Sequence, residues 1–173
     1  MTLWMVKPVL VLDLDGTVRY NKNDKEGFIN KPEDVAIFED VEAKLWEYKD
    51  KGFLIFGASN QGGVAFGHKT AADAVADMER TRELFERDPF DTVAFCPYHP
   101  EGTVPDYAFH SLWRKPQIGM LSALEAEWRT ALRCIIDWPS SIVVGDRAED
   151  AELAQNAGID FIWADQFFGR EQA

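Results

Sequence analysis

Residues 8–17 read Pro-Val-Leu-Val-Leu-Asp-Leu-Asp-Gly-Thr, and this stretch decides the fold. Its apolar run contains no alternating polar residues, which is typical of a central parallel strand buried on both faces. Gly16, directly after the second aspartate, allows the chain to leave the strand sharply. The stretch therefore predicts a buried strand over 8–12, with Asp13 and Asp15 at its carboxyl end.

The rest of the chain alternates short apolar runs with segments of helical period. This alternation predicts an α/β fold, a three-layer Rossmann-like sandwich around a central parallel sheet. With 173 residues, the chain is expected to form one domain over 1–173. The predicted strands are 8–12, 53–56, 92–95, 141–144 and 161–163, and the predicted helices are 41–51, 70–87, 118–132 and 148–157.

Two long stretches, 16–38 and 97–116, show no clear period and are predicted to be loops. Loops of this length are uncommon in compact domains and are usually functional. The spacing of the motifs leaves no room for a separate cap domain, so we expect these loops to govern access to any site at the strand ends. Basic residues outnumber acidic ones early in the first loop and, together with Arg114 and Lys115, predict a cationic entrance; the residues counted in the loop are Arg19, Lys22, Lys25 and Lys31 against Asp24 and Glu26.

The overall charge is strongly negative, with 18 Lys and Arg against 30 Asp and Glu and a formal net charge of -12. Such a surface repels phosphate backbones and anionic lipids, which argues against membrane partners and a broad nucleic-acid surface but allows a local anion site. No apolar run approaches the roughly 18 residues needed to cross a bilayer, and the N-terminus lacks a signal-peptide pattern. Two cysteines, Cys96 and Cys134, do not make a disulfide framework. We expect a cytoplasmic protein, either a monomer or a small homo-oligomer, with Cys134 in its core.

Asp13 and Asp15 lie two residues apart, so an extended backbone places both carboxylates on the same side. Two like charges held together are unfavourable unless a cation neutralises them or one is protonated. The plain alternative is an Asp-Gly turn after a strand. The complete Asp-x-Asp-Gly-Thr string after a buried strand favours a functional site instead.

A second polar segment follows the predicted strand 53–56. Ser59, Asn60 and Gln61 precede two glycines, and a segment of this kind can present N–H groups to an anion. On its own it also fits a plain turn. In open α/β sheets, however, ligands bind beyond the carboxyl ends of the strands, which is where this segment lies.

Charged residues mark the remaining strand end and the end of the second loop. Asp146 follows the strand 141–144, and Asp150 lies four residues further on, within reach across one helical turn. A helix N-cap is the alternative role for Asp146. Arg114 and Lys115 place two cations before a predicted helix, with Pro116 suited to its first position. A solvated basic dipeptide is the alternative there.

In this order the motifs resemble those of the haloacid dehalogenase-like hydrolase superfamily. The residues that carry the resemblance are Asp13-Leu14-Asp15-Gly16-Thr17, Ser59, Lys115, Asp146 and Asp150. Two strings also resemble a subgroup that holds heptose-bisphosphate phosphatases, histidinol-phosphate phosphatases and polynucleotide 3'-phosphatases. These strings are Ser59-Asn60-Gln61-Gly62-Gly63 and Arg114-Lys115-Pro116 with Gly119-Met120.

The resemblance implies phosphoryl transfer through an aspartyl-phosphate. It assigns Asp13 as the nucleophile and Asp15 as the acid that protonates the leaving oxygen and then activates water. Ser59, Asn60 and Lys115 would hold the phosphoryl oxygens and offset their charge. The residues expected to bind the substrate are Asn60, Gln61 and Arg114.

The resemblance also implies a Mg²⁺ cofactor. Its ligands would be Asp13, the backbone carbonyl of Asp15, and Asp146, an all-oxygen set of the kind Mg²⁺ prefers. Asp150 would lie just outside this set and orient a water molecule beside the ion.

The stretch Cys96-Pro97-Tyr98-His99-Pro100 resembles the start of a zinc loop found in the first two types of the subgroup. That loop runs Cys-x-His and later Cys-x-Cys, but here Tyr98, Ser111 and Trp113 occupy three of the four ligand positions. A structural zinc needs four good ligands, so we expect none. The side chains expected to pack the loop instead are Tyr98, Tyr107, Phe109 and Trp113.

Several alternatives stay open at this point. A substitute metal set of Cys96, His99 and His110 is one of them. The predicted function is a Mg²⁺-dependent phosphomonoesterase for a small phosphorylated metabolite, such as a sugar or amino-alcohol phosphate. The alternative is a polynucleotide 3'-phosphatase, favoured by the missing zinc cysteines and opposed by the acidic surface. Two more distant alternatives to hydrolysis remain. One is an inactive binding domain on the same fold, and the other is an enzyme that transfers the phosphoryl group to an acceptor other than water.

Overall fold

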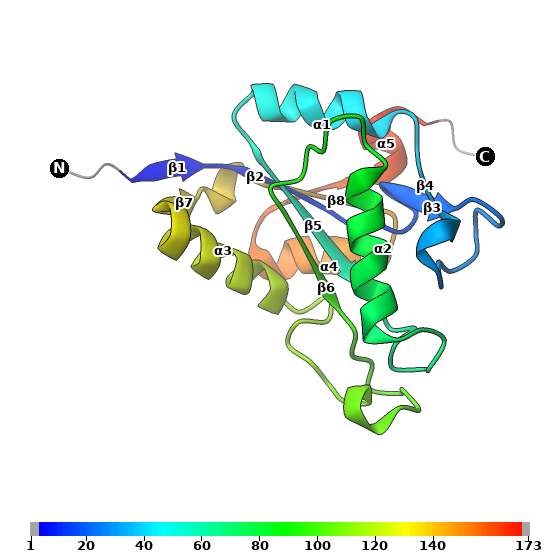
Figure 1. Ribbon diagram of the computed structural model, residues 1–173. Coiled ribbons are helices and arrows are strands. Elements are labelled where there is room, and N and C mark those ends of the chain that lie inside the picture. Colours follow the sequence, from blue (N-terminus) through cyan, green and yellow to red (C-terminus); the bar gives the residue numbers. More distant parts are fainter. Residues whose placement is uncertain (1–3, 171–173) are drawn as a thin grey trace.

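Five parallel strands form the central sheet of the computed structural model, which describes residues 4–170 (Figure 1). Their order across the sheet is β6-β5-β2-β8-β9. The strands are β2 (Val9–Leu12), β5 (Leu54–Asn60), β6 (Thr92–Cys96), β8 (Ile142–Gly145) and β9 (Asp160–Trp163). All five were predicted, although β5 runs four residues further than expected.

Helices cover both faces of this sheet (Figure 1). On β2, Leu10 and Leu12 point into one apolar cluster while Val9 and Val11 point into the other, because successive side chains alternate across a strand. This double burial explains the unbroken apolar run, and it confirms the three-layer α/β sandwich. The helices on the Leu10 face are α1 (Val41–Asp50), α2 (Ala71–Glu83) and α5 (Ala164–Phe168), and those on the Val9 face are α3 (Gly119–Leu132) and α4 (Ala148–Ala157).

The strand order places β2 at the centre, where the winding of the chain reverses. From β2 the chain moves outward to β5 and β6, then crosses back to β8 and β9 on the other side. The carboxyl ends of parallel strands around such a reversal form a crevice, which is the usual ligand site of open α/β sheets. Asp13 lies at this point, directly after β2.

Residues 16–38, called the flap here, are more structured than the loop predicted from sequence. They contain an antiparallel pair, β3 (Arg19–Asn21) and β4 (Val35–Ile37), and a 3₁₀ turn η1 (Pro32–Asp34). Both β4 and η1 contact α2. The flap is therefore tied to the same helix that covers one face of the sheet.

Other differences from the sequence prediction are local. Helix α2 ends at Glu83 instead of residue 87, and α3 begins at Gly119, so Pro116 does not take a first helical position; the Lys115–Pro116 peptide is cis. Within residues 4–170, no helix combines the length and hydropathy that crossing a membrane requires. The smaller elements are a parallel pair β1 (Met5–Lys7) and β7 (Cys134–Ile136), and the turns η2 (Pro105–Tyr107) and η3 (Trp138–Ser140).

Candidate active site

Asp13 lies at the tip of β2 and is buried. Its backbone N–H donates to the carbonyl of Val144, 2.9 Å away, so the strand ladder fixes its position. Lys115, also buried, donates from Nζ to Asp13 Oδ1 at 2.6 Å and to Asp150 Oδ1 at 2.7 Å. Residues more than 100 positions apart along the chain thus meet at one strand end, as predicted.

Asp13, Asp146 and Asp150 form a compact acidic cluster. Each offers one carboxylate oxygen, and these oxygens lie within 4.8 Å of one another. Gly16 permits this arrangement, because it has a φ of +87° and a Cβ there would collide with the Asp146 carboxylate. The chain therefore leaves open the space into which Asp146 projects.

The cluster carries more negative charge than Lys115 neutralises. Burial, with Lys115 opposing and neighbouring carboxylates adding to it, raises the pKa of Asp13 to about 6. Burial and the nearby Asp13 raise the pKa of Asp146 to about 7, and burial also raises the pKa of Asp150. Burial lowers the pKa of Lys115, but Asp13 and Asp150 outweigh this and hold it above its usual value. Carboxylates that are crowded together, have raised pKa values and offer only oxygen ligands fit a divalent cation such as Mg²⁺.

Asp15 lies beside this cluster and accepts hydrogen bonds from three side chains. Arg19 Nε donates to Oδ1 at 2.9 Å and Arg19 Nη2 to Oδ2 at 3.2 Å, which makes a bidentate pair. Ser59 Oγ and Gln61 Nε2 also donate to Oδ2, at 3.2 Å and 2.6 Å. Burial raises the pKa of Asp15, but Arg19 and the other donors outweigh it and hold the pKa below its ordinary value.

The predicted substrate-binding amides support other site residues in this structure. Asn60 bonds both backbone groups of Lys115, since its Nδ2 donates to the carbonyl at 3.1 Å and its Oδ1 accepts from the N–H at 3.0 Å. The second Nδ2 hydrogen goes to Glu149 Oε1 at 3.2 Å. Gln61 Nε2 donates its two hydrogens to Asp15 Oδ2 and to Ser59 Oγ, the latter at 2.8 Å. Asn60 therefore holds Lys115 in place, and Gln61 holds Asp15 and Ser59.

A cavity of about 390 Å³ opens above these groups. Asp13 and Asp15 lie on its wall, whereas Ser59 and Lys115 are buried and are not among its lining residues. Its positive groups are Lys69, Arg114 and Arg147, and its aromatic groups are Phe28, Phe66, His68 and His99. The remaining lining residues are Ile29, Asn30, Asn60, Gln61, Gly62, Gly63 and Glu149.

The cationic entrance predicted from the flap is corrected by the structure. Arg19 is 0% exposed and turns inward to Asp15, and the lysines Lys22, Lys25 and Lys31 are not among the residues that line the cavity. The cations that do line it come from other segments, and sequence reasoning singled out only Arg114 among them. Arg147 directly follows Asp146, which was a usable signal.

Three of the four aromatic side chains predicted to pack the loop 97–116 contact one another, whereas the fourth, Trp113, is 42% exposed. The ring of Tyr98 lies 4.4 Å from that of Phe109 and 5.9 Å from that of Tyr107, centroid to centroid. In the part of the chain that the structure describes, Cys96 is buried next to the carbonyl of Tyr98 and does not gather with His99 and His110 into a three-ligand group. The expectation of no structural zinc stays a prediction.

Comparison with known proteins agrees with this geometry. The family model of the polynucleotide kinase 3 phosphatases matches residues 8–172. A D-glycero-D-manno-heptose-1,7-bisphosphate 7-phosphatase of Thermosynechococcus vestitus is 36% identical over 171 residues, which cover 95% of this chain and 82% of that protein.

Two solved structures share the fold. A haloacid dehalogenase-like phosphatase structure from Mesorhizobium loti superposes with a TM-score of 0.74 at 26% identity, over 92% of this chain and 72% of that one. The D,D-heptose 1,7-bisphosphate phosphatase of B. bronchiseptica, complexed with magnesium and phosphate, gives a TM-score of 0.69 at 21% identity, over 89% and 78%.

Proposed function

The chain belongs to the polynucleotide kinase 3 phosphatase family and to the heptose-bisphosphate subgroup of haloacid dehalogenase-like phosphatases, and we propose that it acts on a phosphorylated sugar. Membership makes it a phosphoric monoester hydrolase. The proposed reaction runs through an aspartyl-phosphate on Asp13. One observation carries the proposal. Asp13 lies on the cavity wall at the central strand end, with the Lys115 ammonium 2.6 Å from its Oδ1 and with Asp146 and Asp150 beside it.

The proposed reaction has two steps at one phosphorus atom. A carboxylate oxygen of Asp13 bonds to phosphorus while the bond from phosphorus to the sugar oxygen breaks, and Asp15 gives its proton to that oxygen. In the second step Asp15 takes a proton from water, and the water oxygen attacks phosphorus. This releases inorganic phosphate and restores the Asp13 carboxylate and the Asp15 proton. A bound phosphate dianion favours protonated Asp15 at the start, because a nearby negative charge raises a carboxyl pKa.

Asp13 and Asp146, with the backbone carbonyl of Asp15, would hold Mg²⁺. When bound, the ion supplies positive charge that draws the phosphate oxygens to Asp13 and offsets the charge that builds up in transfer. Asp150 accepts from Lys115 Nζ at 2.7 Å and from the backbone N–H of Arg147 at 3.2 Å, so both of its oxygens already have donors, which supports a place for it just outside the direct ligands. The magnesium in the B. bronchiseptica phosphatase complex supports this cofactor.

The cavity fits a substrate with a second anionic group. Arg114 donates to the carbonyl of Tyr98 at 3.3 Å and, within residues 4–170, makes no ion pair. Arg147 lies on the same wall. A sugar bisphosphate of the heptose 1,7-bisphosphate kind, the substrate in the name of the T. vestitus relative, would place one phosphate on Asp13 and the other near these arginines. We treat the chain as one cytoplasmic catalytic domain in which the flap and the loop 97–116 take the place of a cap.

A polynucleotide 3'-phosphatase is the second candidate, since the matching family model carries that name. The net charge of -12 opposes it, because such an enzyme is expected to carry a basic groove for the nucleic-acid backbone.

The test offers the protein heptose 1,7-bisphosphate, heptose 7-phosphate and a 3'-phosphorylated oligonucleotide, each with Mg²⁺ and with a chelator. We expect the bisphosphate to release phosphate in Mg²⁺ and not in the chelator. With a radiolabelled bisphosphate, we expect labelled phosphate bound to the protein after an acid quench. Asp13→Asn should lose both signals, while Asp160→Asn, at the opposite end of the sheet, should keep them. Preferential release from the oligonucleotide would favour the second candidate, and full activity of Asp13→Asn would rule out the covalent step.

A further inference from the structure

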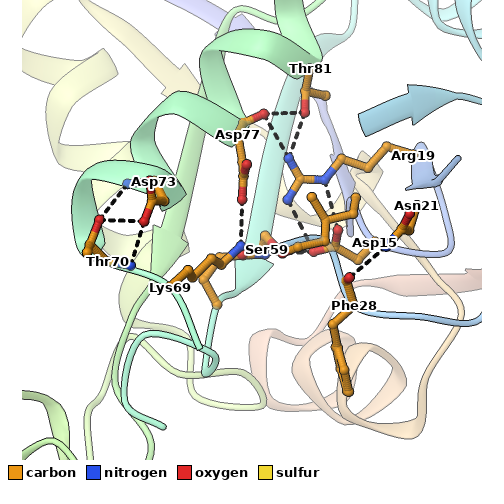
Figure 2. A network of polar contacts seen from close by, with 12 residues as sticks. Asp15, Arg19, Asn21, Phe28, Ser59, Lys69, Thr70, Asp73, Asp77 and Thr81 are labelled. Atoms are coloured by element: carbon orange, nitrogen blue, oxygen red, sulfur yellow. Dashed lines mark hydrogen bonds and ion pairs between the residues drawn. The ribbon is translucent and has the colours of Figure 1, made fainter. Parts of the chain in front are cut away.

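Arg19 is among the largest fully buried side chains in residues 4–170, and it occupies a site between the flap and α2. A tight turn brings it back over Asp15: the N–H of Gly16 donates to the carbonyl of Arg19 at 2.8 Å, and the N–H of Arg19 to the carbonyl of Leu14 at 2.9 Å. This turn places a guanidinium and a carboxylate four residues apart face to face. Figure 2 shows the resulting network.

The guanidinium of Arg19 uses four of its five N–H groups within the protein. Two hold Asp15, and the Nη1 group bonds α2 through the carbonyl of Asp77 at 2.9 Å and Thr81 Oγ1 at 2.6 Å (Figure 2). Thr81 Oγ1 donates in turn to the Asp77 carbonyl at 2.6 Å. Arg19 is thus fixed by a rigid helix on one side and fixes Asp15 on the other.

The arginine and its partner differ in their access to the cavity. The Asp15 side chain is 29% exposed and lies on the cavity wall, whereas Arg19 is 0% exposed and is not among the lining residues. Arg19 therefore has no direct path to a substrate, and any effect that it has on the reaction must pass through Asp15.

A second buried pair completes the charge balance beside Arg19. Lys69 Nζ donates to Asp77 Oδ2 at 2.6 Å and to the flap carbonyl of Ile29 at 2.8 Å. Cations and carboxylates then alternate from the flap to the active site, in the order Lys69, Asp77, Arg19 and Asp15. Since every member is held by a neighbour, the orientation of Asp15 depends on α2 and the flap, as well as on its own strand end.

We propose that Arg19 is a positioning residue that aims the Asp15 carboxyl group at the leaving oxygen, and that Thr81 on α2 supports it. This inference rests on the proposed function, in which Asp15 transfers the proton. The sequence placed Arg19 in a cationic entrance and gave no role to Thr81, so the positioning role of both residues follows from the structure alone. The proposal predicts a kinetic signature that a purely structural arginine would lack.

The signature is a dependence on the leaving group. An alkoxide needs a proton as its bond to phosphorus breaks, whereas para-nitrophenolate leaves without one. Loss of correct aim at Asp15 should therefore lower the single-turnover rate of leaving-group release by about 100-fold for glycerol phosphate and by less than about tenfold for para-nitrophenyl phosphate. This rate reports the first step alone, because the later attack of water, which also uses Asp15, is common to both esters. KM should change little on either ester, because Arg19 does not touch substrate.

The variants are Arg19→Met, Arg19→Lys and Thr81→Val. Thr81→Val removes one hydrogen bond to Arg19 and leaves the shape of the side chain nearly unchanged. This variant therefore tests the proposal even where the arginine variants do not fold. Thr130→Val is the matched control, because Thr130 Oγ1 also donates to a helix carbonyl four residues back at 2.6 Å but lies on α3. We expect a selective loss on glycerol phosphate of several-fold for Thr81→Val, partial retention of activity in Arg19→Lys compared with Arg19→Met, and no change for Thr130→Val.

Equal losses on both esters in the single-turnover rate of leaving-group release, or no loss in Thr81→Val, would overturn the positioning role while leaving the proposed function in place. Failure of the wild-type protein to hydrolyse these esters and heptose 1,7-bisphosphate would overturn the proposed function and this inference together.

Discussion

Asp13→Asn is predicted to stabilise the metal-free protein, and to do so more at high pH than at low pH. Burial raises the pKa of Asp13 from an ordinary 3.8 to about 6, so the folded protein holds the Asp13 carboxylate at a cost relative to the unfolded chain. The shift of about two units corresponds to about 3 kcal/mol of unfolding free energy lost once the pH exceeds 6. Asparagine resembles the protonated side chain and avoids this cost.

The sign follows from proton binding. Between pH 3.8 and about 6 the folded protein binds more protons at Asp13 than the unfolded chain does, so stability falls as the pH rises through this window. At pH 4.5 about 1 kcal/mol of the cost is present, and at pH 8 the full 3 kcal/mol. The stability gain from Asp13→Asn should therefore be about 2 kcal/mol larger at pH 8 than at pH 4.5.

The assay is urea unfolding of both proteins in a chelator at the two pH values. Asp160→Asn, an exposed substitution at the far end of the sheet, reports the general effect of removing one negative charge. Mg²⁺ added at pH 8 should stabilise the wild-type protein and shrink the gap, because a bound cation offsets the same charge. A gain that is equal at both pH values, or larger at pH 4.5, would refute the assignment of Asp13 as a costly buried carboxylate.

Three further substitutions test the site. Gly16→Ala should abolish phosphatase activity and cost about 1–3 kcal/mol in urea unfolding, because the residue has a φ of +87° and its Cβ would meet Asp146; an active, stable variant would contradict this. Asn60→Ala should lower kcat more than it raises KM and cost about 1–3 kcal/mol, since it leaves both backbone groups of Lys115 without their partner; an effect on KM alone would instead indicate direct substrate binding. Phe28→Ala should raise KM for a sugar phosphate several-fold with unchanged Tm, because its ring is 75% exposed at the cavity, and unchanged steady-state kinetics would exclude a substrate contact.

The sheet was predictable because its signals are local. The run from Val9 to Leu12 is buried on both faces, so its apolar character is continuous and needs no knowledge of its neighbours. The flap strands gave no such signal. Each has three residues, and Arg19 places a charged side chain at a fully buried position of β3. The inward turn of that arginine depends on α2, which lies some 60 residues further along the chain.

The gathering of these residues at one edge of the sheet was predictable for a similar reason, whereas the hydrogen-bond partner of each side chain was not. Parallel strands share one carboxyl edge, so residues that follow strands must gather there. The hydrogen bonds of Asn60 and Gln61 span 55 and 46 positions, and nothing in their local sequence separates an amide that binds substrate from one that holds Lys115 or Asp15. Arg147 and Lys69 were missed because a single cation next to a strand or a helix start is common on any surface.

The central position of β2 also bears on how the protein comes to be active. Its two neighbours in the sheet, β5 and β8, both come later in the chain, and the ion pair from Lys115 to Asp13 joins residues 102 positions apart. During synthesis, the proposed nucleophile Asp13 emerges more than 130 residues before its acidic neighbours Asp146 and Asp150. A growing chain therefore has no assembled phosphate site until β8 and the start of α4 have left the ribosome, so phosphatase activity in a nascent-chain series would serve as a direct reporter of complete folding.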